Sequence, residues 1–569
     1  MPVLQATEVE KRMKTSKKPI STVPGDIPAV LYNKYPNMLS VPVTHIFNLI
    51  TATGKWPTKW KIEYVTVIPK KPDPQLPSEC RNISCTNFLS KLYESFLLSW
   101  SREEVRPKIN QYGGEKGASA TQLLIEVVSD ITEALKDNRA GMVLSAVDFS
   151  KAFKRLDHGK CLRAFARKGS SSQFLGLLAS FLSGRFMTVR IGAQHSNLKP
   201  VNAGAPQGSV LGCYLFNIGV DDLDEDTAHE PPGQAEAHEE TLVRTDDFPA
   251  VSTPIRVQST AEITESPIPR SLEQEFTMLP RVANIPHWIR KPKDPTYNEG
   301  ILKSYKFVDD GVNTSKVNMR KARMLVEDGS FFKEIIDLRT QNHIEKVKRR
   351  AEEKGMAINA QKTGLMLVSA ATSFEARVRV NIGGETVTGS DSLKILGVTI
   401  DNDMTFKTHV QTIAARTRSK TWALSKLKKK GLSEERLLRA YKCLIRPTTE
   451  YAAPAWHSLI TAGQMADLEK QQVQALKNIY GPSLSANKLR KKAQIELLSK
   501  RRENLVLNFA QKSLKNRRTS GWFKERTRPS YSRRDGVVYP KYREETASTD
   551  RYRNSPNNYL IRKLNEKGV

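Results

Sequence analysis

The chain has 569 residues, of which 39% are hydrophobic, so it is long enough for several packed subdomains. With 90 Lys and Arg residues against 60 Asp and Glu, the formal net charge is +30, which indicates a polyanionic partner such as nucleic acid; the alternative is a merely soluble basic protein. Five scattered cysteines exclude a disulfide framework, and without a leader pattern or an uninterrupted apolar stretch of about 20 residues we expect an intracellular, soluble protein with no membrane partner.

Two apolar runs mark the first 150 residues. Residues 1–50 are expected to form an N-terminal extension that ends in a helix near Val41–Ile50. Val65–Lys70 alternates and is rich in β-branched residues, which predicts a strand. Met142–Val147 is an apolar run, interrupted only by Ser145, and predicts another strand, with Asp148 at its end. The carboxylate of Asp148 would thus sit where a buried strand meets solvent.

The composition changes after residue 220. Asp221–Ile268 contains 13 acidic and 2 basic residues, and prolines punctuate the surrounding stretch. Such a segment buries little apolar surface. We therefore expect residues 221–300 to be an acidic, Pro-rich, disordered insertion, either a regulatory segment or an artefact of gene prediction.

The second half of the chain returns to ordinary patterns and then becomes basic. Tyr305–Gly311 predicts an apolar strand that runs into a hairpin turn, followed by a helix around Glu345–Lys354 and a strand at Leu365–Val368. After about Thr405 the pattern is helical and basic. Residues 501–569 contain 18 Lys and Arg against 7 Asp and Glu.

Three carboxylates occur where two predicted strands end. Asp148 follows the first apolar run, and Asp309 and Asp310 lie side by side. Mg²⁺ prefers oxygen ligands, and two ions about 3.5–4 Å apart can clamp the attacking and leaving oxygens of an in-line phosphoryl displacement. The bland alternatives are an Asp148 that caps a helix starting at Ser150 and an ordinary hairpin turn at Asp309–Gly311. The two features together favour a metal site.

The order of these residues resembles the reverse transcriptases of non-LTR retrotransposons. The central match consists of Asp148–Phe153 (Asp-Phe-Ser-Lys-Ala-Phe), Pro206–Ser209 (Pro-Gln-Gly-Ser) and Phe307–Asp310 (Phe-Val-Asp-Asp). Further motifs follow in the family's order, namely Arg81–Cys85 with Ser90-Lys91, Gln111–Gly113 with Gly117–Ser119, Asn359–Thr363, Leu396–Val398 and, near the end, Arg551–Pro556. A lone Asp-Asp pair is weak evidence, whereas an ordered series of motifs from about residue 20 onward is specific.

The resemblance implies an α+β fold of the right-hand polymerase type, with fingers, a palm containing an antiparallel sheet, a helical thumb and a basic C-terminal helical extension. The ranges that follow are 1–50 for the N-terminal extension, 51–140 for the fingers, 141–220 and 301–404 for the two parts of the palm, 221–300 for the insertion, 405–500 for the thumb and 501–569 for the C-terminal extension. The insertion is the largest departure from the family, in which this connection is often much shorter.

By resemblance, Asp148, Asp309 and Asp310 are catalytic and hold two Mg²⁺ (or Mn²⁺) ions, with Asp310 the less direct ligand. Phe153 would stack under the incoming sugar and exclude a 2′-hydroxyl, which favours dNTP over NTP; the alternative is a core phenylalanine on an amphipathic helix. Lys154 stands where many family members carry Asp, at a position that is not expected to hold metal.

The other substrate-binding candidates are a glutamine, a glycine and three cations. Gln207 and Gly208 would let the backbone approach the nucleotide and template, since glycine has no Cβ. Lys70 and Arg81 could grip the triphosphate, Arg through a bidentate fork and Lys as a point charge. Lys362 could protonate pyrophosphate as a general acid. Each cation could instead be an ordinary surface residue.

The expected thumb carries a cluster of cations where the resemblance places the template–primer duplex. Phosphate contacts of this kind give sequence-independent affinity, although runs of Lys and Arg are usually plain solvated faces. We expect the aromatic residues of this region to be thumb core rather than stacking platforms. The cations are Arg416, Arg418, Lys420, Lys426, Lys428, Lys429 and Lys430, and the aromatic residues are Trp422, Tyr441, Tyr451 and Trp456.

The implied function is an RNA-directed DNA polymerase that uses an RNA template, a DNA primer and dNTPs. Two alternatives stay open: a non-catalytic nucleic-acid-binding relic of such an element, and an RNA-templated RNA polymerase. We recognise no endonuclease domain, zinc knuckle or ribonuclease H constellation in the sequence, so target cleavage would come from a longer parent protein or from elsewhere. A nuclear location would suit an integrating element.

Overall fold

Two five-stranded sheets organise the part of the chain that the structure, a computed structural model, describes. The described residues are 1–16, 23–136, 140–150, 152–192, 194–206, 208–223, 303–307, 310–318, 330–369, 377–525, 541–547 and 549–568. They belong to one unit, which comprises Met1–Leu223 and Gly300–Val569. The insertion expected at 221–300 lies outside the described residues from residue 224 onward.

Three residues that we assigned to the insertion are instead held in the fold. Asp221 is buried and forms an ion pair with Lys168 at 2.6 Å. Asp222 pairs with Lys354, also at 2.6 Å, and Leu223 is buried. The packed part of the chain therefore continues three residues past the boundary expected from composition, because these acidic residues meet cations that are distant in sequence.

The first sheet has the strand order β2–β1–β4–β5, with β6 paired to β4. β1 pairs antiparallel with β2 and parallel with β4. Its members are β1 (Ile62–Pro69), β2 (Cys80–Cys85), β4 (Arg185–Ile191), β5 (Gln194–His195) and β6 (Lys199–Val201). β1 is the strand predicted at Val65–Lys70.

The helices of the N-terminal half pack together around one hydrophobic core. The helix expected near Val41–Ile50 is α3, whereas α1 and α2 before it were not predicted. Residues from α1 to α3 share one hydrophobic core with α4, α7, α8 and α9, so the expected N-terminal extension packs as part of the same core. The bounds are α1 (Ala6–Thr15), α2 (Ala29–Lys34), α3 (Pro36–Thr53), the 3₁₀ turns η1 (Thr58–Lys61) and η2 (Pro77–Glu79), α4 (Phe88–Glu104), α7 (His158–Arg167), α8 (Ser172–Leu182) and α9 (Gly212–Gly219).

The second sheet is antiparallel and has the order β10–β3–β8–β7, with β9 paired to the end of β3. Its strands are β3 (Ala140–Ser150), β7 (Lys303–Phe307), β8 (Asp310–Asn318), β9 (Ala357–Ile358) and β10 (Gly364–Ser369). β3 extends two residues beyond the end predicted at Asp148, and β10 contains the strand predicted at Leu365–Val368.

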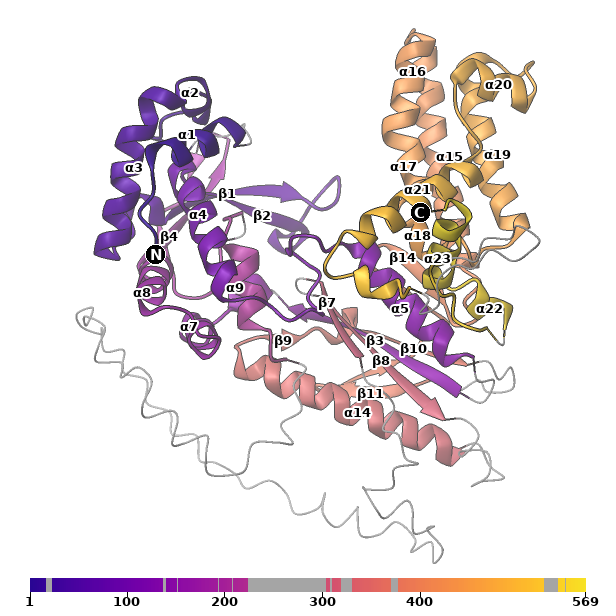
Figure 1. Cartoon of the computed structure of the whole chain (residues 1–569), viewed down its shortest axis with the longest axis horizontal. Helices are drawn as coiled ribbons and strands as arrows, with labels where there is room; N and C mark the ends of the chain where they lie inside the picture. The colour runs from indigo at the N-terminus through magenta and orange to yellow at the C-terminus, as the bar shows by residue number, and fades with distance from the viewer. Residues whose placement is uncertain are drawn as a thin grey trace, which may run out of the picture. The chain divides into compact units, whose positions relative to one another are not determined.

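This second sheet is buried on both faces. Successive residues of β3 alternate, so that Met142 and Leu144 join a core with α5 (Ala120–Ala134) while Val143 and Val147 join a core with α14 (Ser330–Glu353). Figure 1 shows the two helices on opposite sides of the strands. Because both faces of the sheet are buried, nearly all residues of β3 between Met142 and Val147 are apolar, instead of every second residue.

Two small hairpins lead from the second sheet to the helical C-terminal half. They are formed by β11 (Arg379–Ile382) with β12 (Glu385–Thr388) and by β13 (Ser392–Ile395) with β14 (Val398–Asp401). The turn between β13 and β14 uses Leu396 and Gly397, which both have positive φ and belong to the Leu396–Val398 motif. The remaining short elements are α6 (Ala152–Arg155) and the 3₁₀ turn η5 (Ala360–Lys362).

Helices follow from Lys407 onward, as the basic helical pattern predicted. They are α15 (Lys407–Lys429), α16 (Glu434–Ala440), the π-helical turn η6 (Tyr441–Ile445), α17 (Arg446–Glu450), α18 (Ala453–Trp456), α19 (Ala462–Tyr480), α20 (Ala486–Ala493) and α21 (Leu498–Leu514). Tyr441 and Trp456 are buried, as expected for core residues, but Trp422 is 64% exposed and Tyr451 47% exposed. The expectation of an aromatic core was therefore wrong for Trp422 and Tyr451.

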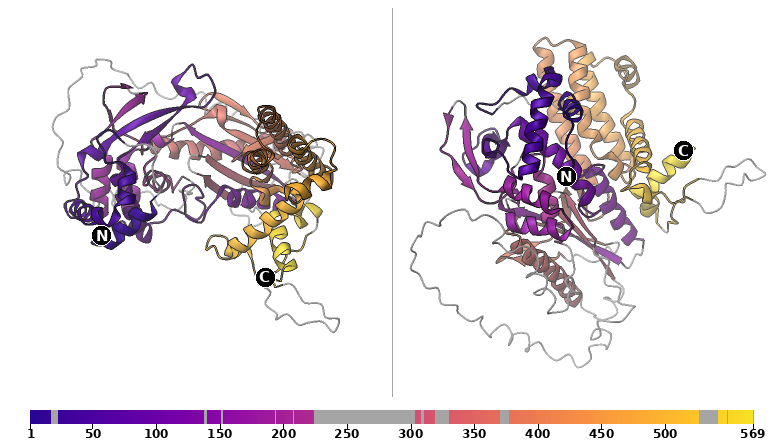
Figure 2. Two further views of the ribbon diagram at one scale, coloured as in Figure 1. Left: turned by 90° about the horizontal axis from the view of Figure 1, so that it is seen from above. Right: turned by 60° about the vertical axis from the view of Figure 1, so that its left-hand side comes forward.

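The basic C-terminal region packs against α5 instead of projecting as a tail. Its described elements are the 3₁₀ turn η7 (Ser520–Trp522), α22 (Asp550–Arg553) and α23 (Pro556–Glu566). Leu560, Ile561 and Leu564 of α23 are buried in the same core as α5 and one face of the second sheet. The yellow C-terminal helices lie beside α5 in Figure 1, and Figure 2 shows the same helices from two other directions. Of the helices that the structure describes, none is long and apolar enough to cross a membrane.

Candidate active site

Asp148 and Asp310 lie at opposite positions of the central strand pair. β3 and β8 are antiparallel, and their register runs from Ala140 opposite Asn318 to Asp148 opposite Asp310. The two aspartates are separated by about 160 residues of sequence, yet the strand pairing makes them neighbours within roughly 4.5–5.5 Å between Cα atoms. The structure therefore brings together two of the three carboxylates singled out from the sequence.

The third carboxylate belongs to the connection that follows β7. β7 and β8 form the expected hairpin, and their last pair is Phe307 opposite Asp310. Only Val308 and Asp309 separate these two residues in sequence, and both lie outside the described residues. Gln207 also lies outside them, and for Asp310 only the backbone is described.

Asp148 is part of a strand and caps no helix. β3 continues to Ser150 and the next helix, α6, begins at Ala152. The Asp148 carboxylate is only partly exposed, and its Oδ2 atom accepts no hydrogen bond from the described residues. A buried acceptor that receives no hydrogen bond costs free energy, and a cation next to Asp148 Oδ2 would offset that cost.

The cation that the structure places beside Asp148 is Lys362. The backbone N–H of Asn359 donates to the Asp148 carbonyl at 2.8 Å, and the turn η5 then brings the Lys362 Nζ atom to 3.4 Å from Asp148 Oδ2. Most of the Lys362 side chain is exposed, which leaves its ammonium group accessible from solvent. Asp148, Asp310 and Lys362 thus meet at one end of the second sheet.

The loop that contains the Pro-Gln-Gly motif is hydrogen-bonded to the chain just after Asp148. The Gly204 N–H donates to the Leu156 carbonyl, and the Ala205 N–H donates to the Phe153 carbonyl, both at 2.8 Å. Gly204 has φ +87°, and a Cβ atom there would lie 2.6 Å from the Phe153 carbonyl oxygen. The two motifs, far apart in sequence, therefore form one packed corner.

Gly208 is constrained by a contact within the protein that the sequence did not predict. Its φ is +132°, and a Cβ atom at this position would collide with the carbonyl oxygen of Ser84 in β2. The close approach seen in the structure is thus between the loop and the first sheet. An approach of the same backbone to nucleotide or template remains a prediction.

Phe153 is partly buried and stacks on Phe216 of α9, with 4.7 Å between ring centroids and 22° between ring planes. Its ring also packs against two of the hydrophobic cores. This contact agrees with the alternative of a core phenylalanine, and it also fixes the ring close to the corner formed by the loop. A contact with the incoming sugar remains a prediction.

Lys70 and Arg81 lie near the turn end of the β1–β2 hairpin, in the first sheet. Arg81 is opposite Ile68 in the register, and the Lys70 N–H donates to the Glu79 carbonyl at 2.8 Å. Both residues are exposed. They are neighbours on one hairpin, in a different sheet from Asp148.

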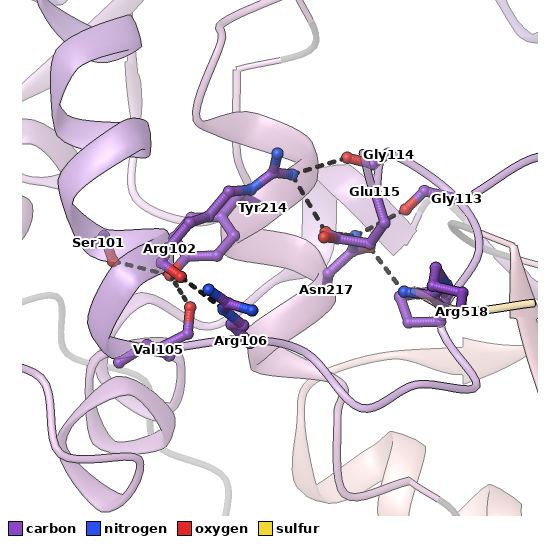
Figure 3. Close-up of polar contacts among 11 residues, drawn as sticks. Ser101, Arg102, Val105, Arg106, Gly113, Gly114, Glu115, Tyr214, Asn217 and Arg518 are labelled. Atoms are coloured by element: carbon purple, nitrogen blue, oxygen red, sulfur yellow. Dashed lines mark hydrogen bonds and ion pairs between the residues drawn. The ribbon is translucent and has the colours of Figure 1, made fainter. Parts of the chain in front are cut away.

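A polar network that the motifs did not reveal connects α4, α9 and the segment after α4. Figure 3 shows Asn217 donating through Nδ2 to the Gly113 carbonyl at 2.7 Å and to Glu115 at 3.0 Å, while Arg102 contacts the Gly114 carbonyl at 2.9 Å. Asn217 is fully buried on α9. Its acceptors are the backbone carbonyl of Gly113, in the Gln-Tyr-Gly motif, and the side-chain carboxylate of Glu115, about 100 residues earlier in the chain, so the pairing could not be deduced from local sequence.

The same network involves a buried tyrosine of α9. Tyr214 donates its hydroxyl to the Val105 carbonyl at 2.8 Å and contacts the Ser101 hydroxyl at 2.7 Å (Figure 3). Burial raises the pKa of the Tyr214 phenol, which keeps the hydroxyl protonated and able to donate. α9 is therefore anchored to α4 and to the following segment along its length.

The segment Asn110–Tyr112 joins this network to the aspartate hairpin. The Tyr112 N–H donates to the Lys306 carbonyl at 2.7 Å, and the Lys306 N–H donates to the Asn110 carbonyl at 2.9 Å. From the C-terminal region, the Arg518 guanidinium donates to the Gln111 carbonyl at 2.6 Å. Residues from three distant parts of the sequence therefore support the strand that leads to Asp309 and Asp310.

The donor set at the end of the second sheet fits a hard divalent cation. Carboxylate oxygens are the ligands that Mg²⁺ and Mn²⁺ prefer, and Asp148 offers an oxygen that receives no hydrogen bond. Among the residues whose side chains are described, no group of three or more His, Cys, Asp or Glu residues has metal-binding geometry. The side chains of Asp309 and Asp310 are not among these.

Comparisons with known proteins agree with the motif order. The family described as reverse transcriptase (RNA-dependent DNA polymerase) matches residues 68–253, which include Asp148 and the Pro-Gln-Gly loop and stop before Asp310. The probable RNA-directed DNA polymerase from transposon X-element of Drosophila melanogaster is 24% identical over 454 residues, 78% of this chain and 40% of that protein. The RNA-directed DNA polymerase from mobile element jockey of the same species is 22% identical over 494 residues, 84% of this chain and 44% of that protein.

A shorter match extends the comparison to a different element. The Pol polyprotein from type-1 retrotransposable element R2 of Popillia japonica is 27% identical over 173 residues, 30% of this chain and 24% of that protein. The chain spans less than half the length of each of these relatives. The strand-end aspartates, the ordered motifs and the family match agree: residues 68–253 match the reverse transcriptase family, and the chain as a whole is similar to RNA-directed DNA polymerases of retrotransposable elements.

Proposed function

We propose that this chain is an RNA-directed DNA polymerase, which adds dNTPs to a DNA primer 3′ end on an RNA template. The observation that carries the proposal is the register of β3 and β8, which sets Asp148 opposite Asp310, together with the position of Lys362 beside Asp148. The family match and the names of the relatives support the same reaction. We assign residues 51–140 to fingers, 141–220 and 301–404 to the palm, 405–500 to the thumb and 501–569 to a basic extension.

In this proposal Asp148, Asp309 and Asp310 hold two Mg²⁺ or Mn²⁺ ions. When bound, such ions lower the pKa of the attacking 3′-hydroxyl and neutralise charge on the leaving pyrophosphate. Asp148 supplies its Oδ2 atom, which accepts no hydrogen bond from the described residues and has only the Lys362 ammonium group beside it as an ion-pair partner, at 3.4 Å. Asp310 is the first residue of β8 and Asp309 directly precedes it in sequence, so the β7–β8 hairpin would supply the other two carboxylates.

Lys362 acts as the proton donor to the leaving pyrophosphate. Its ammonium group lies 3.4 Å from Asp148 and its side chain is exposed, so it can reach a substrate held at the aspartates. Proton donation by a positioned side chain contributes about 10²–10⁴-fold to a reaction rate.

The remaining substrate residues have more limited roles. Phe153 forms the wall against the 2′-hydroxyl of an incoming NTP, supported from behind by Phe216. Gln207 and Gly208 present the loop backbone to the nucleotide and template. Lys70 and Arg81, exposed on the β1–β2 hairpin, neutralise the triphosphate.

α15 is the main contact of the thumb with the template–primer. It contains seven Lys and Arg residues and no Asp or Glu. The exposed ring of Trp422 lies 4.9 Å from the Lys426 ammonium group, so an aromatic surface is interleaved with the cations. Such a surface binds nucleic acid through phosphate contacts and stacking, and its affinity depends on salt.

The experiment that tests this function measures dTTP incorporation on poly(rA)/oligo(dT) with Mg²⁺ or Mn²⁺, beside an Asp309→Asn, Asp310→Asn double variant. We expect incorporation by the parent and none by the variant. A parent that binds the primer–template in a salt-dependent way without extending it would show a non-catalytic relic instead. With UTP in place of dTTP, Phe153→Val should gain incorporation; an unchanged preference would exclude the wall.

A further inference from the structure

Glu94 of α4 is a fully buried carboxylate that neither the motifs nor the proposed reaction uses. Its Oε2 atom accepts hydrogen bonds from the backbone N–H groups of Val210 at 2.7 Å and Leu211 at 3.1 Å. Its Oε1 atom accepts from the Ser90 hydroxyl at 3.0 Å. Burial raises the pKa of Glu94, and the hydrogen bonds it accepts act in the opposite direction.

These contacts hold the end of the Pro-Gln-Gly loop. Val210 and Leu211 directly follow the motif and directly precede α9, which begins at Gly212. N–H groups at the start of a helix have no partner within the helix, and negative charge is favoured there. Within the loop, the Ser209 hydroxyl accepts from the Gly212 N–H at 2.8 Å, and Glu94 supplies from α4 the acceptor for the N–H groups of Val210 and Leu211.

The loop held in this way connects three parts of the site. Upstream of Glu94's contacts, the Ala205 N–H donates to the Phe153 carbonyl, five residues after Asp148. Gly208 lies so close to the Ser84 backbone of β2 that a Cβ atom at this position would collide with the Ser84 carbonyl oxygen. A change of backbone position at Val210 and Leu211 would therefore act on Gly208, beside the first sheet, and on Ala205, which is bonded to the segment that carries Phe153.

We propose that Glu94 is a positioning residue, whose buried carboxylate fixes the Pro-Gln-Gly loop in the geometry that accepts the incoming dNTP. It touches neither metal nor substrate and acts only through the loop. The proposal rests on the proposed function for its link to dNTP, whereas the link between Glu94 and the loop is independent of activity. It names a determinant of nucleotide affinity in α4, outside the motifs that the sequence singled out.

The test compares Glu94→Ala with Ser101→Ala, which removes a different buried hydrogen bond between α4 and α9 and leaves the loop contacts in place. We expect Glu94→Ala to raise the KM for dNTP about tenfold or more and to keep kcat within about threefold of the parent's. The reason is that the loss of these charge-assisted hydrogen bonds changes the geometry of the Pro-Gln-Gly loop. Ser101→Ala should leave the KM unchanged. Glu94→Gln should fall between, because its amide oxygen can still accept from both N–H groups while its NH₂ donates to Ser90.

A second readout does not depend on activity. Hydrogen exchange at the Val210 and Leu211 amides should be faster in Glu94→Ala than in the parent, and unchanged in Ser101→Ala. Unchanged exchange in Glu94→Ala would overturn the positioning role. Faster exchange with an unaltered KM, or a loss of kcat alone that Ser101→Ala reproduces, would overturn the link to dNTP and leave only a structural role. A parent that exchanges as expected but incorporates no dNTP would contradict the proposed function and this link, while the role of Glu94 in the loop would stand.

Discussion

Gly208 is held by a constraint that the sequence could only half reveal. A glycine within a Pro-Gln-Gly motif predicts a close backbone approach, but the partner found in the structure is Ser84, more than 120 residues earlier. With φ +132°, any other residue at this position is strained, and its Cβ atom also meets the Ser84 carbonyl oxygen. The close contact between the Pro-Gln-Gly loop and β2 is thus possible only because Gly208 has no Cβ atom.

Gly208→Ala should therefore lower stability by about 1–3 kcal/mol and remove most primer extension. The measurements are thermal unfolding and dNTP incorporation. Gly463→Ala is the matched control, because Gly463 lies in α19, has an ordinary φ and would meet only Thr461 at 3.8 Å. There the change should stabilise slightly, since alanine favours helix over glycine. A Gly208→Ala variant as stable and active as the Gly463→Ala control would contradict the constraint.

Lys362 gives a test of proton donation as opposed to charge. Lys362→Ala should lower the rate of single-nucleotide incorporation about 100-fold. Lys362→Arg keeps a cation near Asp148, but a guanidinium does not release its proton in this pH range. If Lys362 is a general acid, arginine should fail to restore the rate, and rapid-quench kinetics across pH would show the loss. Full activity of Lys362→Arg would reduce its role to electrostatics.

At the scale of single residues, the sequence identified the chemistry but not the residues that support it. Asp148 was recognisable because it ends an apolar run and is followed in order by the Pro-Gln-Gly motif and the Asp309-Asp310 pair, and the structure sets it opposite Asp310. Glu94 and Asn217 gave no signal, because a buried polar residue is distinguished only by partners that are distant in sequence. Such pairings follow from tertiary packing, which local patterns do not contain.

At the scale of elements, continuous and alternating apolar runs were reliable. β3 and β10 appear where apolar runs predicted strands, and α15 begins two residues after the expected start of the helical region. α1 and α2 were missed because short helices are stabilised mainly by packing rather than by their own propensity. The exposed Trp422 was misjudged because a tryptophan is usually buried, and only the packed helices show which face it occupies.

Trp422→Ala should weaken binding of the primer–template about tenfold, the effect of losing one stacking contact on a basic helix. Fluorescence anisotropy with a labelled duplex, repeated over a range of salt concentrations, measures both affinity and the number of phosphate contacts. The salt dependence should be unchanged, because no cation is removed. Trp422→Phe retains an aromatic face and should bind nearly as the parent does. An alanine variant with parental affinity would show that α15 meets nucleic acid through its cations alone.

At the scale of the whole molecule, the described C-terminal helices share a hydrophobic core with the second sheet. Composition suggested a basic extension, yet α23 packs on α5 and shares a core with the second sheet. Arg518 donates to the carbonyl of Gln111, the residue that forms an isolated β-bridge with Lys306. Charge could not reveal this, because the apolar residues of α23 are interspersed with Lys and Arg that remain at its surface.

Leu560→Ala should thus destabilise the entire described unit rather than fray one end. Leu560 is fully buried, and removal of a core leucine costs about 2–5 kcal/mol. Calorimetry should show one transition at a lower temperature, with primer extension lost at the same temperature. Leu198→Ala, at an exposed position, should leave the transition in place. A separate early transition in Leu560→Ala, with polymerase activity retained above it, would contradict a shared core.

The most direct test of the proposed active site is the effect of Asp148→Asn on the protein's incorporation of dNTPs into a DNA primer on an RNA template in Mg²⁺. Asp467→Asn is the matched control. Asp467 is an exposed carboxylate of α19 that pairs with Lys470, so its loss should change nothing. We expect full incorporation by the parent and by Asp467→Asn. We expect none by Asp148→Asn, although this variant should still fold and bind the duplex. Incorporation by Asp148→Asn at the parental rate would contradict the assignment of the active site to the end of the β3–β8 pair.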